Sequence, residues 1–248
     1  MKRRWCLAMT LSTLLSAADL LKLQQLFDPK LAPTQRANAC FELRGNAEPE
    51  VIRAMSRALE NPGLVSCAAD NLRIVNAIEP LKQALHSPDA EARAAAAREL
   101  GTFEDPDLLV ALSEAALDEN ALVGSNALAA LTEYHDRRVI PYLAALAKKG
   151  GMIGDMALER ILQLDAKTAL TIARPLLGSE QVPDKLYAMR TLGAAGDRSD
   201  LAALQKIAAT AEEAPAQRAR GFGFMPPINL ARAAESAIAS IESRTESR

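Results

Sequence analysis

The sequence is poor in the residues that most often carry out chemistry. Its 248 residues include two histidines, three cysteines and one tryptophan, and aromatic residues make up only 4% of the chain. His86 and His135 have no cysteine at metal-ligand spacing, so we expect both at the surface or in turns. No paired carboxylates, phosphate-binding glycine loop or Ser/His/Asp set stands out either. We therefore expect no catalytic activity, no cofactor and no metal site.

The chain also lacks an excess of positive charge. It has 29 basic and 31 acidic residues, for a formal net charge of −2. Without its first 18 residues it would have 26 basic residues against 31 acidic ones, a net charge of −5. Because an acidic chain is a poor ligand for polyanions, we expect no nucleic-acid partner.

What the sequence does contain favours helices arranged in repeats. Ala and Leu dominate, and 49% of the residues are hydrophobic. Six times an Ala precedes a Leu or Ile by four residues, and successive pairs lie 28 to 31 residues apart. Units of this length bury their apolar faces only by stacking, which gives a solenoid with an extended surface. The pairs are Ala39/Leu43, Ala68/Leu72, Ala96/Leu100, Ala127/Leu131, Ala157/Ile161 and Ala188/Leu192.

The third repeat shows the pattern of a helical hairpin most clearly. Ser87 and Pro88 predict the N-cap and first residue of a helix that continues to Leu100, and Gly101 predicts its end. A second helix is predicted to start at Asp105. Its apolar face would comprise Leu108, Leu109, Leu112, Ala116 and Leu117.

Aspartates recur at the predicted start of the second helices. Asp105, Asp136 and Asp197 share one repeat position, where a carboxylate accepts the free N–H groups of a helix. We interpret them as structural caps rather than catalytic groups. Asp165, Glu48 and Asn76 are weaker copies of this feature, Gly193 is predicted to end its helix, and Gly124 and Gly154 are predicted to allow close helix packing.

The third repeat, from Glu91 through Leu100-Gly101 to Asp105-Pro106, resembles a HEAT repeat, including the short HEAT-like form of phycobilin lyase subunits. The resemblance covers about 33–209, and a capping half-repeat extends it to about Ser243. It implies a right-handed superhelix with the second helices on the concave side, and protein binding as the commonest use. A lyase or chaperone subunit acting on a chromophore-binding protein is a further alternative, and a HEAT-like DNA glycosylase is disfavoured by the acidic chain.

The N-terminus has the pattern of a secretory signal peptide. Basic residues at 2–4 are followed by an apolar stretch, Trp5 to Leu15, and by the small residues Ser16 to Ala18. We predict cleavage after Ala18, a periplasmic or secreted protein, and no stable membrane anchor after cleavage. The alternative is a cytosolic scaffold in which these residues extend the first helix.

Cleavage would leave two cysteines, Cys40 and Cys67, near the same point of their repeats. In an exported chain such a pair suggests a disulfide between neighbouring helices. Two buried thiols that pack as small apolar residues are the alternative.

The repeat spacing fails once, near the C-terminus. Ala188/Leu192 is followed by Ala234/Ile238, 46 residues later, and the excess lies in 211–227. Loops of this length in compact domains are functional or disordered. We predict that this insertion binds a protein partner, with Phe222, Phe224 and Met225 as apolar anchors and Arg218 and Arg220 as polar contacts. The alternative is that it folds back and plugs the concave groove.

The predicted organisation has five parts, and the fold class is an all-α solenoid of about six HEAT-like hairpins. The parts are a signal peptide (1–18), an N-terminal helix (19–32), the repeat array (33–210), the insertion (211–227) and a C-terminal capping helix with its tail (228–248).

Overall fold

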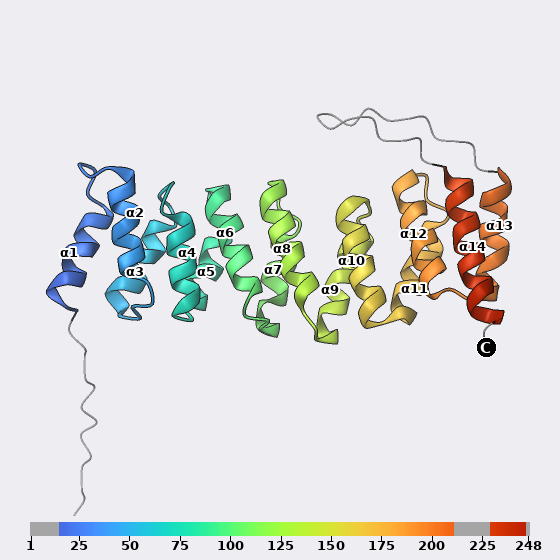
Figure 1. Ribbon diagram of the computed structural model, residues 1–248, viewed down its shortest axis with the longest axis horizontal. Helices are drawn as coiled ribbons and strands as arrows, with labels where there is room; N and C mark the ends of the chain where they lie inside the picture. Colours follow the sequence, from blue (N-terminus) through green and yellow to red (C-terminus); the bar gives the residue numbers. More distant parts are fainter. Residues whose placement is uncertain (1–14, 211–228, 247–248) are drawn as a thin grey trace, which may run out of the picture. The chain divides into compact units, whose positions relative to one another are not determined.

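The computed structural model describes residues 15–210 and 229–246, and every regular element in these ranges is a helix (Figure 1). The chain divides into two compact units, Met1–Thr102 and Phe103–Arg248. Within each unit, successive helices alternate between two layers. The predicted all-α, α-solenoid fold class is confirmed.

In the first unit, each first helix of a repeat contacts the first helix of the next repeat, and the second helices pack beside them. An additional helix, α1 (Ala17–Leu26), packs against the first repeat. The first helices are α2 (Pro33–Glu42), α4 (Val65–Ile74) and α6 (Ala90–Gly101), and the second helices are α3 (Pro49–Ala58) and α5 (Ile78–Ala84).

The second unit follows the same plan, and its last helix packs against the two helices before it. One layer holds α8 (Ala121–Glu133), α10 (Gly151–Leu164), α12 (Val182–Ala195) and α14 (Leu230–Glu246). The other holds α7 (Leu109–Ala115), α9 (Ile140–Ala147), α11 (Ala166–Leu176) and α13 (Leu201–Thr210). Short 3-10 helices precede three of these: η1 (Pro106–Leu108), η2 (Arg137–Val139) and η3 (Arg198–Asp200).

The small/large pairs that define the repeat are core residues. All twelve side chains of the six Ala/Leu and Ala/Ile pairs are at most 1% exposed. The alanines allow neighbouring backbones to approach, and the large residues fill the space between helices. The period in the sequence is therefore the period of the core.

The repeated aspartates act as caps. The side chain of Asp105 accepts a hydrogen bond from the N–H of Asp107 at 3.0 Å. In the same way, the side chain of Asp136 accepts the N–H of Arg138 at 2.8 Å. The side chain of Asp197 accepts the N–H of Ser199, also at 2.8 Å. Each aspartate begins a 3-10 helix rather than the α-helix itself. Asp165 caps α11 directly by accepting the N–H groups of Lys167 and Thr168.

Several local predictions about helix ends are wrong. Gly101 is the buried last residue of α6, and Thr102 is its C-cap. Gly193 lies inside α12, which continues to Ala195. The side chain of Asp89, rather than that of Ser87, caps α6 by accepting the N–H groups of Glu91 and Ala92.

The predictions for weaker caps and for one apolar position also need correction. The side chain of Glu48 makes no capping hydrogen bond to α3. Asn76 has a φ of 54° and precedes Ala77, the N-cap of α5. Leu117 lies beyond the end of α7 and is 51% exposed, whereas the other four predicted residues of that face are buried.

Two glycines confirm the expected close approach of helices. A methyl group added at Gly154 would lie 2.9 Å from the carbonyl oxygen of Ala147, and one at Gly124 would lie 3.3 Å from that of Ala116. Both glycines are in first helices of the second unit, where the preceding second helix ends against them.

Candidate functional site

The predicted anchors of the insertion, Arg218, Arg220, Phe222, Phe224 and Met225, lie outside the described residues. The two cysteines lie within them. Cys40 of α2 and Cys67 of α4 form a disulfide, with their Cα atoms 6.3 Å apart, and both side chains are buried. This bond joins two neighbouring first helices of the first unit.

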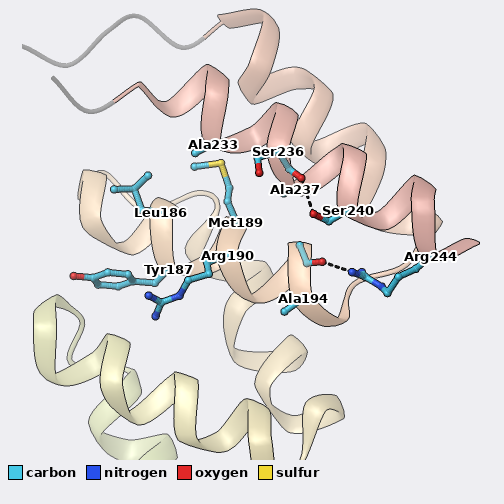
Figure 2. Close-up of a pocket in the computed structure, with 11 residues that line it drawn as sticks. Leu186, Tyr187, Met189, Arg190, Ala194, Ala233, Ser236, Ala237, Ser240 and Arg244 are labelled. Atoms are coloured by element: carbon cyan, nitrogen blue, oxygen red, sulfur yellow. Dashed lines mark hydrogen bonds between the residues drawn. The ribbon is translucent and has the colours of Figure 1, made fainter. Parts of the chain in front are cut away.

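A groove lies between α12 and α14, and we call it the α12–α14 groove (Figure 2). It has a volume of about 700 Å³. The two helices approach closely at Gly193, where an added methyl group would lie 3.2 Å from the Cα atom of Ala237. Small residues therefore line the groove along its length: Gly193, Ala194, Ala233, Ser236, Ala237 and Ser240.

Larger side chains of α12 line the groove beside these small residues. Leu186 and Met189 supply apolar surface, and Tyr187 and Arg190 come from the same helix (Figure 2). Arg190 forms ion pairs with Asp155 and Glu159 of α10, so its charge is balanced. Burial raises the pKa of the Asp155 carboxyl group, against the opposing attraction of the Arg190 guanidinium.

A second arginine lies on the α14 side of the groove. Arg244 donates hydrogen bonds to the backbone carbonyl of Gly193 and, at 3.0 Å, to that of Gly196. Both of these partners are neutral carbonyl groups. Among the described residues, the groove lining contains no histidine, cysteine or carboxylate. Its small and apolar residues are suited to binding an apolar chain.

A second groove, the α9–α11 groove, separates two second helices of the same unit. Both helices pack against α10. The groove has a volume of about 560 Å³ and is lined mainly by apolar atoms. Its lining residues are Ala144, Lys148, Thr168, Thr171, Ile172, Pro175 and Leu176. Pro175 lies within α11 and has no N–H group to donate to the carbonyl of Thr171.

The remaining polar clusters have structural partners. Arg73 of α4 pairs with Asp70 and, at 2.9 Å, with Glu99 of α6. Arg174 of α11 holds the buried carboxylate of Asp200 at 2.8 Å. These pairs join successive helices and were not predicted, because only the folded array brings their members together.

The histidines do not form a metal site in the described part of the chain. His86 and His135 are both exposed, and Nδ1 of His135 lies 3.6 Å from a carboxylate oxygen of Glu104. Over residues 15–210 and 229–246, no group of three or more His, Cys, Asp or Glu side chains is placed to hold a metal ion.

None of the helices within residues 15–210 and 229–246 is both long enough and apolar enough to cross a bilayer.

One family model and several solved structures are similar to this chain. No curated protein matches the sequence. Similar solved structures include human deoxyhypusine hydroxylase in complex with glycerol, 21% identical over 91% of this chain and 96% of that chain, with a TM-score of 0.38. Another is the complex of CpcE and CpcF of phycocyanin lyase from Nostoc sp. PCC7120, 17% identical over 97% and 100% of the two chains, with a TM-score of 0.43. The family model for HEAT repeats matches residues 78–151, so the predicted resemblance to HEAT repeats is confirmed in this segment.

Proposed function

We propose that this protein is an exported, non-catalytic scaffold that binds a protein partner at its second unit. The observation that carries the proposal is the α12–α14 groove, whose lining combines small and apolar residues with arginine and hydroxyl groups and has no acid–base pair. Repeat arrays provide extended surfaces of this kind, on which side chains of a partner can be bound.

Export is supported by the disulfide and by the N-terminal sequence pattern. A bond between Cys40 and Cys67 is stable in the periplasm or outside the cell, whereas the cytosol keeps thiols reduced. Intact mass spectrometry of the native protein tests this. We expect a chain that begins at Asp19 and has no free thiol. A chain that retains residues 1–18 and has Cys40 and Cys67 as free thiols would support the cytosolic scaffold instead.

The insertion has more length than its connecting role needs. The chain leaves α13 at Thr210 and enters α14 at Leu230, and these two helices pack together. Helix–helix connections in compact arrays usually take about 2–8 residues. The extra length contains the predicted anchors Phe222, Phe224 and Met225, and the next helix, α14, carries Ala233 of the α12–α14 groove.

The double substitution Phe222→Ala/Phe224→Ala tests the role of the anchors. We expect loss of partner binding with an unchanged melting temperature. A large fall in melting temperature without loss of binding would instead mean that the insertion plugs a groove of its own chain. Met152→Ala is a matched control, because Met152 is a large apolar residue on α10 that is 71% exposed.

A further inference from the structure

The charged residues of α11 and of the two positions after α9, which border the α9–α11 groove, are all basic. Neither α9 with the two residues after it, nor α11, contains an aspartate or glutamate, although the whole chain has a net charge of −2. Lys148 lines the groove. Lys149 is the next residue in the chain, and Lys167 directly precedes the lining residue Thr168. None of these three lysines has a carboxylate within ion-pair distance in the described part of the chain.

Carboxylates near the ends of α11 have partners of their own. Asp165 accepts the N–H groups at the start of α11 and pairs with Arg137 at 2.6 Å. Asp200 and Asp197 pair with Arg174, at 2.8 and 3.4 Å. Among the described residues that line the groove, Lys148 alone is charged, so the charge that the lining offers to a ligand is positive.

Backbone chemistry adds a hydrogen-bond acceptor to the groove. In a regular helix the carbonyl of Thr171 would accept the N–H of residue 175, but residue 175 is a proline and has none. The hydroxyl groups nearby are engaged, because that of Thr171 donates to the carbonyl of Lys167 and that of Thr168 to the carboxylate of Asp165. A ligand with an N–H group would supply the donor that Pro175 lacks.

We propose that the α9–α11 groove binds an acidic, apolar peptide segment of a protein partner. An apolar side chain would lie against Ile172 and Leu176, a backbone N–H would donate to the carbonyl of Thr171, and a carboxylate would pair with Lys148. The volume of about 560 Å³ suits a few side chains. The proposal rests on the protein-binding role proposed above and adds the chemistry of the bound segment.

Fluorescence anisotropy with the purified full chain tests this proposal. The probe is a short labelled peptide of Leu-Asp-Glu repeats, and its matched control is a peptide of Leu-Lys-Lys repeats. We expect the acidic peptide alone to bind, and to bind more weakly as salt is added. Lys148→Glu should weaken binding about fivefold or more, whereas Lys30→Glu, the same charge change on the exposed surface of the first unit, should leave it unchanged.

A second variant tests the carbonyl without disturbing the fold. Pro175→Ala restores the N–H that closes the regular hydrogen bond to Thr171, so the helix should be at least as stable as before. Because the acceptor is then occupied, we expect binding of the acidic peptide to weaken about threefold. Unchanged affinity in this variant would overturn the role of the carbonyl.

Other outcomes would overturn the proposal as a whole. One is that the acidic peptide does not bind, and another is that both peptides bind equally. A third is that Lys148→Glu and Lys30→Glu lower the affinity for the acidic peptide by the same factor. Binding of phosphatidylglycerol vesicles through Lys148, without peptide binding, would assign the groove to a lipid. If partner binding survives Phe222→Ala/Phe224→Ala, the proposed anchors of the insertion are contradicted, but the proposal for the α9–α11 groove is not. Failure of the anchor proposal and failure of the groove proposal are therefore distinguishable.

Discussion

The hydroxyl group of Tyr134 donates a 2.8 Å hydrogen bond to the backbone carbonyl of Asp105, 29 residues earlier in the chain. Tyr134 follows α8 and is completely buried, whereas Asp105 caps η1, at the start of the preceding second helix. The bond therefore ties the end of one helix to the cap of another inside the second unit.

This contact predicts a loss of stability at high pH. Burial, together with the carboxylates of Asp105 and Glu104, raises the pKa of Tyr134 to about 12. An unfolded tyrosine has a pKa of about 10. The folded state thus binds the phenolic proton more tightly than the unfolded state does. The stability gained from this proton is complete below about pH 10 and is lost as the pH rises toward about 12.

The measurement is the difference in melting temperature between the natural chain and Tyr134→Phe, which has no proton to lose at this position. We expect the natural chain to be the more stable at about pH 8 and its advantage to shrink above about pH 10. An advantage that stays constant over this range would contradict the prediction.

Reduction of the disulfide should destabilise the first unit. Cys40 and Cys67 are separated by 27 positions, and closing a loop of that length stabilises a fold by about 3 kcal/mol in the chain-entropy model. Circular dichroism monitors the unfolding. We expect dithiothreitol to lower the unfolding midpoint of the natural chain. The variant Cys40→Ala/Cys67→Ala should be insensitive to the reductant. Equal midpoints for the natural chain with and without reductant would count against the bond.

Gly154→Ala should destabilise the second unit by about 1–3 kcal/mol, because the added methyl group would lie 2.9 Å from the backbone carbonyl oxygen of Ala147. Gly178→Ala is the matched control, since its methyl group would meet the carbonyl oxygen of Pro175 at an ordinary 3.5 Å. Urea unfolding of both variants measures the difference. The prediction fails if the two substitutions have the same effect.

Asn71 provides a polar link in the core of the first unit. Its amide donates to the carbonyl of Leu43 at 3.1 Å and accepts the N–H of Gly45 at 3.2 Å, and its side chain is buried. Asn71→Ala would leave both backbone groups without this partner, at a cost of about 1–3 kcal/mol. Asn38→Ala, on the exposed side of α2, should change the unfolding free energy far less in the same urea titration.

The fold could be predicted because the repeat is encoded locally. An alanine four residues before a leucine, as in Ala96 and Leu100, places a small and a large residue on one side of a helix, and recurrence of the pair gives the period of the array. Asp105 could be identified as a cap for the same reason, because a cap acts on N–H groups two or three residues away.

Features that depend on distant residues could not be predicted in this way. Gly193 looks like a helix terminator in the sequence, but it is buried in α12 because Ala237 of α14 packs against it. The two grooves depend on the same kind of pairing between helices. One local signal for the α9–α11 groove was present, namely Pro175 within a helical pattern.

The proposed exported scaffold would bind a protein through its second unit and its insertion. Crosslinked affinity capture from the native cell envelope is the decisive experiment, with the full chain compared with a chain lacking residues 218–227 and with Met152→Ala. We expect a stoichiometric protein partner that is retained by the full chain and by Met152→Ala and lost on deletion. Absence of a protein partner from the full chain, or equal capture by the deleted chain, would rule the proposal out.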